Sequence, residues 1–245
     1  MLFLLRNIRR KLISKDNKVI SYLLYAIGEI VLVVVGILIA VQIDDWNENR
    51  KKSRLERKIL TEIKADLQND LYEIHDEMVG YDVIQKADSA LQAFFYSDET
   101  FTDSLGTFVY LMELNPHFNP IKGGYQLLQS KGIDLISNDS LRSSINRYYE
   151  QSIPYYEKYG NERLGVVLQE FISFNYQNFY LVSVPYFPGK SRMPIDFKIL
   201  KDMKWLSMIQ SSARLAEVQS EIASGLEEEI IELKNHISQE LKSQK

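Results

Sequence analysis

Uncharged and mostly apolar residues run from Val19 to Ile43, and only Glu29 interrupts them. The run reads VISYLLYAIGEIVLVVVGILIAVQI. About 20 apolar residues cross the hydrocarbon core of a bilayer as an α-helix, so this run is long enough to cross it with some tilt. It is too long for the apolar region of a signal peptide, and no A-x-A-like cleavage site follows it. The pattern therefore predicts an uncleaved transmembrane helix over residues 19–43.

Two long segments beyond this run have apolar residues at the helical spacing of three and four positions. In residues 46–95, the stripe consists of Leu60, Ile63, Leu67, Leu71, Ile74, Met78 and Tyr81. In residues 196–242, it consists of Leu215, Val218, Ile222, Leu226, Ile230, Leu233, Ile237 and Leu241. Packing the two helices antiparallel buries both stripes. The sequence thus predicts a long, coiled-coil-like antiparallel helical hairpin.

The region between these segments contains most of the helix-breaking residues. Asn115-Pro116 and Asn119-Pro120 are strong breakers, and Pro154 should end or kink any helix that reaches it. We expect helices at residues 103–114, 124–131, 139–153 and 155–180. The stretch VPYFPGKSRMPID, residues 184–196, is expected to be a loop because it is rich in Pro. A small helical head and an all-α fold are therefore predicted for the extramembrane domain, residues 44–245.

The amino-terminal segment, residues 1–18, alternates apolar and basic positions. Its apolar residues Leu2, Leu5, Ile8 and Leu12 share one helical face, and basic residues surround the rest. Two interpretations stay open: a basic amphipathic helix that lies on an anionic leaflet, or a charged tail that only sets the topology.

The orientation in the membrane depends on the flanks of the apolar run. The basic residues before it are Arg6, Arg9, Arg10, Lys11, Lys15 and Lys18. Those after it are Arg50, Lys51, Lys52, Arg54, Arg57 and Lys58, so the two counts tie. Asp44, Asp45 and Glu48 separate the second group from the run, and long domains translocate largely regardless of charge. We expect a cytoplasmic amino terminus and a periplasmic domain, hence an inner-membrane protein.

Composition narrows the chemistry. The 245-residue chain has a net charge of −4, which argues against a general nucleic-acid-binding surface. It contains no Cys, which excludes disulfides, thiolate catalysis and cysteine metal sites. His75, His117 and His236 have no partner at a metal-binding spacing, and Gly123-Gly124 lacks the other residues of a phosphate loop. We expect no metal, no cofactor, no catalytic residue and no enzymatic activity.

The predicted membrane helix and its flanks form the segment KVISYLLYAIGEIVLVVVGILIAVQIDDWNENRKK. Its pattern YAIGEI…GILIA…WNE, after a basic amino terminus, resembles the signature of a family of uncharacterised membrane proteins, chiefly from Bacteroidota. The similarity is tight over residues 1–64 and looser over NPIKGGYQLLQSKGIDLISNDSLRSSINRYY, residues 119–149. The resemblance implies a single-pass helical protein and implies no particular biochemical activity.

Glu29 lies about 10 Å into the predicted membrane helix, where an acid is costly. Its helical face consists of Tyr22, Ala26, Glu29, Val33, Gly36 and Ala40. Gly36 and Ala40 form a small-xxx-small pair that lets another helix approach closely. Three interpretations remain open. Glu29 hydrogen-bonds across an oligomer or partner interface, or it snorkels towards Lys18 or water as a depth marker, or it carries protons, as in single-span subunits of proton-driven envelope motors.

Aromatic residues gather in the second half of the chain. They are Tyr148, Tyr149, Tyr155, Tyr156, Tyr159, Phe171, Phe174, Tyr176, Phe179, Tyr180, Tyr186 and Phe187. Aromatic side chains with polar tips line ligand pockets, and they also fill the cores of helical heads. Both interpretations stay open.

Together these patterns predict a membrane-anchored, non-enzymatic interaction or scaffold protein of the bacterial envelope. Its expected partners are the lipid bilayer and either a second copy of the chain or another membrane protein, with no nucleic acid. Two alternatives remain: a ligand-sensing helical domain that signals through a partner, and a proton-coupled accessory subunit that acts through Glu29.

Overall fold

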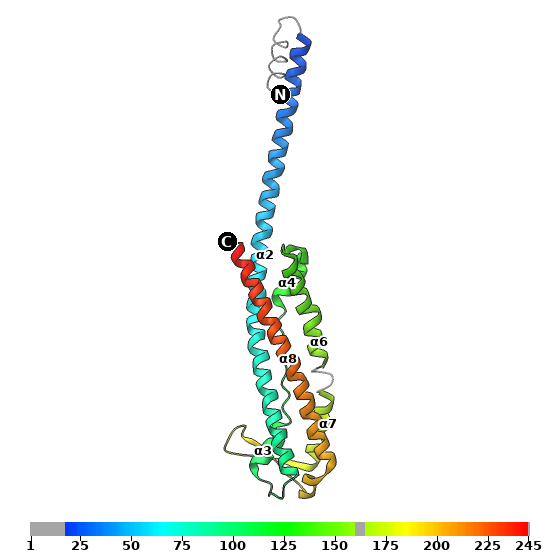
Figure 1. Cartoon of the computed structure of the whole chain (residues 1–245). Helices are drawn as coiled ribbons and strands as arrows, with labels where there is room; N and C mark the ends of the chain where they lie inside the picture. Colours follow the sequence, from blue (N-terminus) through cyan, green and yellow to red (C-terminus); the bar gives the residue numbers. More distant parts are fainter. Residues whose placement is uncertain (1–17, 160–164, 245) are drawn as a thin grey trace. The chain divides into compact units, whose positions relative to one another are not determined.

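The computed structural model describes residues 18–159 and 165–244 (Figure 1). The predicted amphipathic segment, residues 1–18, lies outside the described residues except for Lys18. The chain divides into two compact units, Met1–Leu55 and Glu56–Lys245, which we call the first and the second unit. The described part of the chain is mostly helical, as the sequence predicted.

The longest helix, α2, spans Lys18–Phe95 without a break. Among the described residues it is the one helix that is long and apolar enough to cross a membrane, judged by length and composition. Gly80 lies within this helix, and the absence of a side chain at Gly80 makes room for a neighbour. A Cβ at Gly80 would lie 2.7 Å from Cγ of Pro116. At the carboxyl end of α2, Lys201 Nζ donates to the carbonyl oxygens of Phe95 and Ser97, at 2.7 and 2.6 Å.

The other elements of the second unit are short until the last helix. The α-helices are α3 (Asp103–Leu111), α4 (Gly123–Lys131), α5 (Asp139–Arg147), α6 (Ile153–Glu157), α7 (Gly165–Asn178) and α8 (Met203–Ser243). Two 3₁₀-helices are η1 (Ile133–Leu135) and η4 (Phe197–Lys201), and η2 (Tyr148–Ser152) is a π-helix. The strands are β1 (Phe179–Ser183) and β2 (Lys190–Pro194).

Within the second unit, α2 packs against α8, which confirms the predicted pairing of the long helices. Two side-chain hydrogen bonds show the direction of the helices. Gln210 Nε2 donates to Gln92 Oε1 at 3.0 Å, and Lys234 Nζ donates to Gln68 Oε1 at 2.6 Å. The later residue of α2 thus meets the earlier residue of α8, so the helices are antiparallel. The buried stripe residues include Ile63, Leu67, Ile74, Leu226, Ile230, Leu233 and Ile237. The cyan and red ribbons of Figure 1 show the pair.

The prediction of an all-α fold is wrong at residues 179–194, where β1 and β2 form an antiparallel two-stranded sheet. Phe179 pairs with Pro194 and Ser183 with Lys190. The predicted loop contains the turn of this hairpin, closed by Gly189 at a φ of +77°, and also all of β2. The stretch Tyr180-Leu181-Val182 is rich in residues that favour strands, and of these three only Tyr180 lies in the predicted helix, residues 155–180.

Of the two effects expected of Pro154, an end or a kink of the preceding helix, the end does not occur. The chain continues from α5 through the π-helical turn η2 into α6, in which Pro154 occupies the first turn. The Ile153 N–H bonds back to the Tyr148 carbonyl, five residues earlier. A wider turn before a residue without an N–H is one way to continue a helix past a proline. Further on, α8 begins at Met203 and not at residue 196, because Asp202 caps it.

The main apolar core of the second unit lies where the end of α2 meets α3, α7, the sheet and the start of α8. Its three largest fully buried side chains are Trp205, Tyr81 and Phe171. Phe179, the first residue of β1, lies against Trp205, with ring centroids 5.9 Å apart. This core anchors the base of the hairpin to the helices.

Candidate functional site

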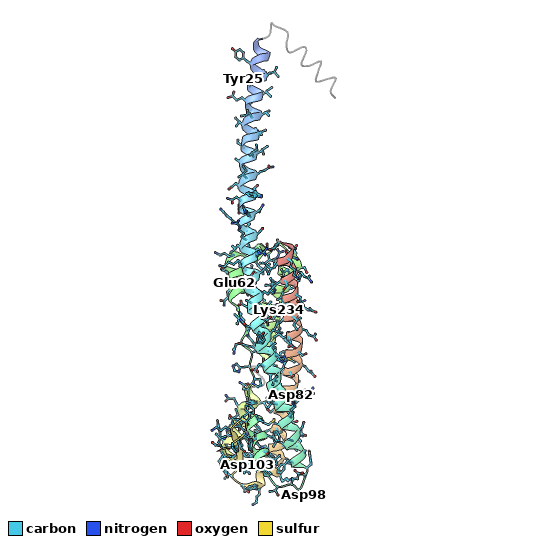
Figure 2. All side chains as sticks on the ribbon, turned by 90° about the vertical axis from the view of Figure 1, so that its left-hand side faces the viewer. Tyr25, Glu62, Asp82, Asp98, Asp103 and Lys234 are labelled. Atoms are coloured by element: carbon cyan, nitrogen blue, oxygen red, sulfur yellow. The ribbon has the colours of Figure 1, made fainter. Side chains whose placement is uncertain are left out.

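The predicted contact face of α2 lies in the first unit. Its members Tyr22, Ala26, Glu29, Val33, Gly36 and Ala40 are all exposed. Among the described residues, no atom outside the helix lies within 4 Å of a Cβ built at Gly36. Figure 2 shows side chains standing outward around this part of the helix, Tyr25 among them. The structure therefore brings the six residues onto one helix and gives their face no partner within the described chain.

Aromatic and charged side chains follow the apolar run. The Arg50 guanidinium carbon lies 5.4 Å from the ring centroid of Trp46. Glu48 and Lys52 form an ion pair at 3.0 Å, one helical turn apart. Tryptophan and arginine with this spacing suit the polar boundary of a membrane, where a ring and a cation can share the headgroup region.

A second feature, which the sequence analysis missed, is a carboxylate row on α2: Asp66, Asp70, Glu73 and Glu77. Their spacing of three and four residues places them on one helical face. The first three hold the chain that leads into α4: Asp66 Oδ2 accepts the Gly124 N–H at 2.7 Å, Asp70 Oδ1 the Ile121 N–H at 2.9 Å, and Glu73 Oε2 the Asn119 N–H at 3.2 Å. The row thus replaces a strand or helix as the hydrogen-bond partner of an extended segment.

Glycine permits this close approach. A Cβ at Gly124 would lie 2.7 Å from the backbone nitrogen of Ile63, so even alanine would push α4 away from α2. The segment NPIKGGYQLL, residues 119–128, therefore owes its Gly to packing against α2. No side-chain periodicity in the sequence reveals this contact, because the bonds involve backbone N–H groups about 50 residues from the acids.

Asp70 is fully buried, and its Oδ2 accepts the Tyr148 hydroxyl at 2.9 Å. Burial raises the pKa of Asp70 from 3.8 to about 6, although the bonds from Ile121 and Tyr148 lower it. The neighbouring carboxylates Asp66 and Glu73 raise the pKa further. Burial and the Asp70 charge together raise the pKa of Tyr148, so the hydroxyl stays the donor of this pair.

Glu77 belongs to a buried polar cluster with Tyr81, Tyr156 and Gln219. The Tyr81 hydroxyl donates to Glu77 Oε1 at 2.6 Å, while Glu77 Oε2 and the Tyr156 hydroxyl have no hydrogen bond of good geometry. Burial raises the pKa of Glu77, and the nearby Tyr156 and Tyr81 hydroxyls lower it. Beside this cluster, Glu73, Asp76 and His117 contribute to the lining of a hollow of about 450 Å³.

The aromatic residues divide by burial. Tyr148, Tyr149, Tyr156, Phe171 and Phe179 are buried, as expected for core residues. A stacked pair, Tyr125 and Tyr149, has ring centroids 4.4 Å apart. Exposed aromatics are Tyr155, Tyr176, Tyr180, Tyr186 and Phe187. Among the described residues, these aromatic side chains are spread over buried and exposed positions, and Tyr155 and Tyr156 contribute to a shallow hollow of about 480 Å³ beside α8.

A buried ion pair fixes the hairpin to the helices. Arg192 of β2 donates from Nε and Nη2 to Glu113, at 2.9 and 2.8 Å. Asn175 of α7 donates to the same carboxylate at 2.8 Å, and the Tyr176 ring centroid lies 4.8 Å from the Arg192 guanidinium carbon. Both charged groups are nearly fully covered. Because the charges are paired in bidentate geometry, this cluster holds β2 in one position.

The three histidines lie apart from one another. His75 Nδ1 lies 3.5 Å from Glu227 Oε1, and His117 Nδ1 lies 3.2 Å from the Asn115 carbonyl oxygen. His236 lies beside Glu229 and Glu232 at a small hollow. Within residues 18–159 and 165–244, no group of three or more His, Asp or Glu side chains is placed to hold a metal ion.

Comparison with known proteins identifies a family and no activity. The chain belongs to a family of unknown function, DUF6090, which matches residues 29–184. The match begins at Glu29 and includes the predicted contact face from there on, the carboxylate row, and β1. No curated protein and no solved structure shows significant similarity to the chain.

Proposed function

We propose that this DUF6090 protein is a membrane-anchored, non-enzymatic interaction protein whose α2 helix crosses the inner membrane and associates with α2 of a second copy. The length and apolar composition of α2 support the anchor. Trp46 and Arg50 support a membrane boundary just after the apolar run. Glu56–Lys245 is then the domain that extends from the anchor.

The observation that carries this proposal is the exposed face of α2. Its members recur at alternating spacings of four and three residues, which is the period of 3.5 found in left-handed helix pairs. Small residues at positions 36 and 40 leave room for a second backbone, and the described chain supplies none. In a shared membrane two copies insert with the same orientation, so their helices are parallel and each residue meets its own counterpart.

Glu29 has a role in such a pair. The Glu29 side chains of the two copies would lie opposite each other, so each acid gains a polar partner that lipid does not supply. Interhelical hydrogen bonds in membranes average about 0.6 kcal/mol, so the acid adds specificity more than affinity. The close contact at Gly36 supplies the larger part of the association.

Crosslinking through a single cysteine tests the pair. The chain has no Cys, so Val33→Cys is the only thiol in the protein. In membranes under oxidising conditions, the Val33→Cys protein should form a disulfide-linked dimer. Gly36→Leu should abolish most of the dimer, Glu29→Ala should weaken association about threefold, and Glu29→Gln should behave like the parent, because an amide still hydrogen-bonds.

Gly28→Leu is the matched control. At 3.6 residues per turn, Gly28 lies about 120° around the helix from the centre of the face, and it too has open space around it. Its replacement should leave the dimer intact. Equal crosslinking in Gly36→Leu and Gly28→Leu would refute the helix contact. If deletion has a phenotype that Glu29→Gln reproduces as fully as Glu29→Ala, a proton path is the better reading.

Topology has its own test. The acids directly after the apolar run and the long domain that follows favour an extracytoplasmic second unit. Asp98, labelled in Figure 2, lies in the exposed loop after α2. Asp98→Cys should react with a membrane-impermeant maleimide as soon as the outer membrane is permeabilised. Reaction only after lysis of the inner membrane would place the domain in the cytoplasm.

A further inference from the structure

The outer edge of β1 carries backbone groups that β2 does not use. In an antiparallel pair, alternate residues direct their N–H and C=O groups towards the partner strand. The bonds from Val184 N to Gly189 O and from Ile195 N to Asn178 O fix this alternation. Residues 180 and 182 therefore bond to β2, and the N–H and C=O groups of Leu181 and Ser183 point away from it. Within the described chain, Leu181 and Ser183 form no hydrogen bond outside the pairing of β1 with β2.

Apolar side chains accompany this edge. Tyr180 is 53% exposed, Leu181 46% and Phe187, in the turn, 87%. Of the large apolar side chains that the structure describes as exposed, Phe187 is the most exposed. Natural sheets protect such edges with lysine, proline or a bulge within the strand, but β1 reads Phe-Tyr-Leu-Val-Ser and contains no charge and no proline.

The other side of the sheet is closed. Helix α3 packs on β2, and a Cβ at Gly106 would lie 2.6 Å from the Arg192 carbonyl oxygen. Ser191 Oγ donates to the Asp103 carbonyl at 3.0 Å, and Arg192 is held by Glu113. The hairpin is therefore fixed through β2, and β1 is the edge it leaves open.

We propose that β1 pairs antiparallel with β1 of a second copy, so that two hairpins form one four-stranded sheet across a two-fold axis. An unpaired strand edge is satisfied by another strand and by no compact small ligand. The strand is uncharged, so its pairing with itself brings no like charges together. A two-fold pairing through residue 182 also covers Leu181 of each copy with the other copy.

This contact goes beyond the α2 pair and does not require it, since β1 lies in the second unit. Where both exist, the α2 contact raises the effective concentration of one β1 for the other. The test is therefore made in the Gly36→Leu background, which removes the α2 contact, and in the parent.

The experiment uses the full chain in mild non-ionic detergent with Val182→Cys as the only thiol. Directly opposed residues of a two-fold strand pair lie close enough for a disulfide. We expect crosslinked dimer in both backgrounds. Ser207→Cys, exposed in α8 at the same end of the unit, should give at least tenfold less. Equal crosslinking at both positions would show random collision and overturn the pairing.

Leu181→Pro blocks the edge selectively. Its lost N–H points away from β2, a position at which edge strands tolerate proline. We expect at least a tenfold loss of Val182→Cys crosslinking. In a Trp46→Phe background, the fluorescence of the buried Trp205 should match that of the parent. If Leu181→Pro unfolds, Leu181→Lys replaces it, because two lysines on opposite sides of the two-fold axis repel each other.

Unchanged crosslinking in a folded edge variant would overturn the proposal, as would capture of a different protein at position 182 in membranes. Loss of crosslinking at Val33 alone bears on the α2 pair and not on β1.

Discussion

Leu233→Asp should lower the free energy of unfolding of the second unit by more than about 3 kcal/mol. Leu233 is 3% exposed and lies in the stripe of α8 that faces α2. The substitution removes buried apolar area and places an unpaired carboxylate in the contact, and burying an unpaired charge is among the most destabilising single changes. Leu67→Asp, on the facing stripe of α2, should have an effect of similar size.

Unfolding of the full chain by urea in non-ionic detergent measures this effect. The chain has two tryptophans, so in a Trp46→Phe background the fluorescence comes from Trp205, which is fully buried in the second unit. Ile231→Asp is the matched control, since Ile231 lies on the same helix and is 41% exposed. It should change the free energy by less than about 0.5 kcal/mol. Similar losses in Leu233→Asp and Ile231→Asp would mean that the long helices share no core.

The long helices were predictable because each carries its own signal. Apolar residues at spacings of three and four identify α2 and α8 without any knowledge of their partners. Two stripes of similar length leave few ways to bury both, and an antiparallel pair is the simplest. The resemblance of the anchor segment to a family was likewise local, and the match of residues 29–184 confirms membership of a family of unknown function.

The hairpin was missed because proline outweighed propensity. Pro185 and Pro188 lie in the turn and Pro194 ends β2, so none of them removes a bond that the ladder needs. Proline is compatible with a strand at such positions, whereas a sequence window counts it only as a breaker. The partner strand also lies too close in sequence to the end of α7 to stand apart from the helical pattern.

The carboxylate row was missed for a different reason. Asp66, Asp70 and Glu73 look like the solvated face of an amphipathic helix, and acids on a helix usually are. These acids differ from a solvated face because they accept hydrogen bonds from backbone N–H groups of residues 119–124. The sequence alone does not place those residues near α2. Gly124 is the one local trace of the contact, because a side chain there would strike the helix.

Asp70 makes the second unit less stable as the pH rises from about 4 to about 8. Its pKa is about 6 in the folded protein against an ordinary value of 3.8, because burial disfavours the charged form. A raised pKa in the folded state means that its stabilising effect is complete below the unfolded pKa and is lost as the pH passes the folded pKa. The gap corresponds to about 3 kcal/mol.

Other charged groups surround Asp70 and act in the same experiment. Asp66 and Glu73 face it and raise its pKa, and Ile121 and Tyr148 donate to it and lower it. Burial also raises the pKa of Glu77, farther along the row, so its ionisation adds to the loss of stability as the pH rises. The contribution of Asp70 alone is therefore the difference between the parent and a variant that cannot ionise at this position.

Asp70→Asn is that variant. Its amide oxygen can still accept the Ile121 N–H, and its NH₂ group can donate to the Tyr148 oxygen, so both contacts survive in another form. By urea unfolding followed through Trp205, parent and variant should have nearly equal free energies at pH 4. At pH 8 the variant should be more stable by up to about 3 kcal/mol. Asp82→Asn, exposed on the same helix, should follow the parent at every pH. If Asp70→Asn lost stability relative to the parent as the pH rose, the Asp70 carboxylate would be a stabilising anion of the row, and burial would not be its dominant cost.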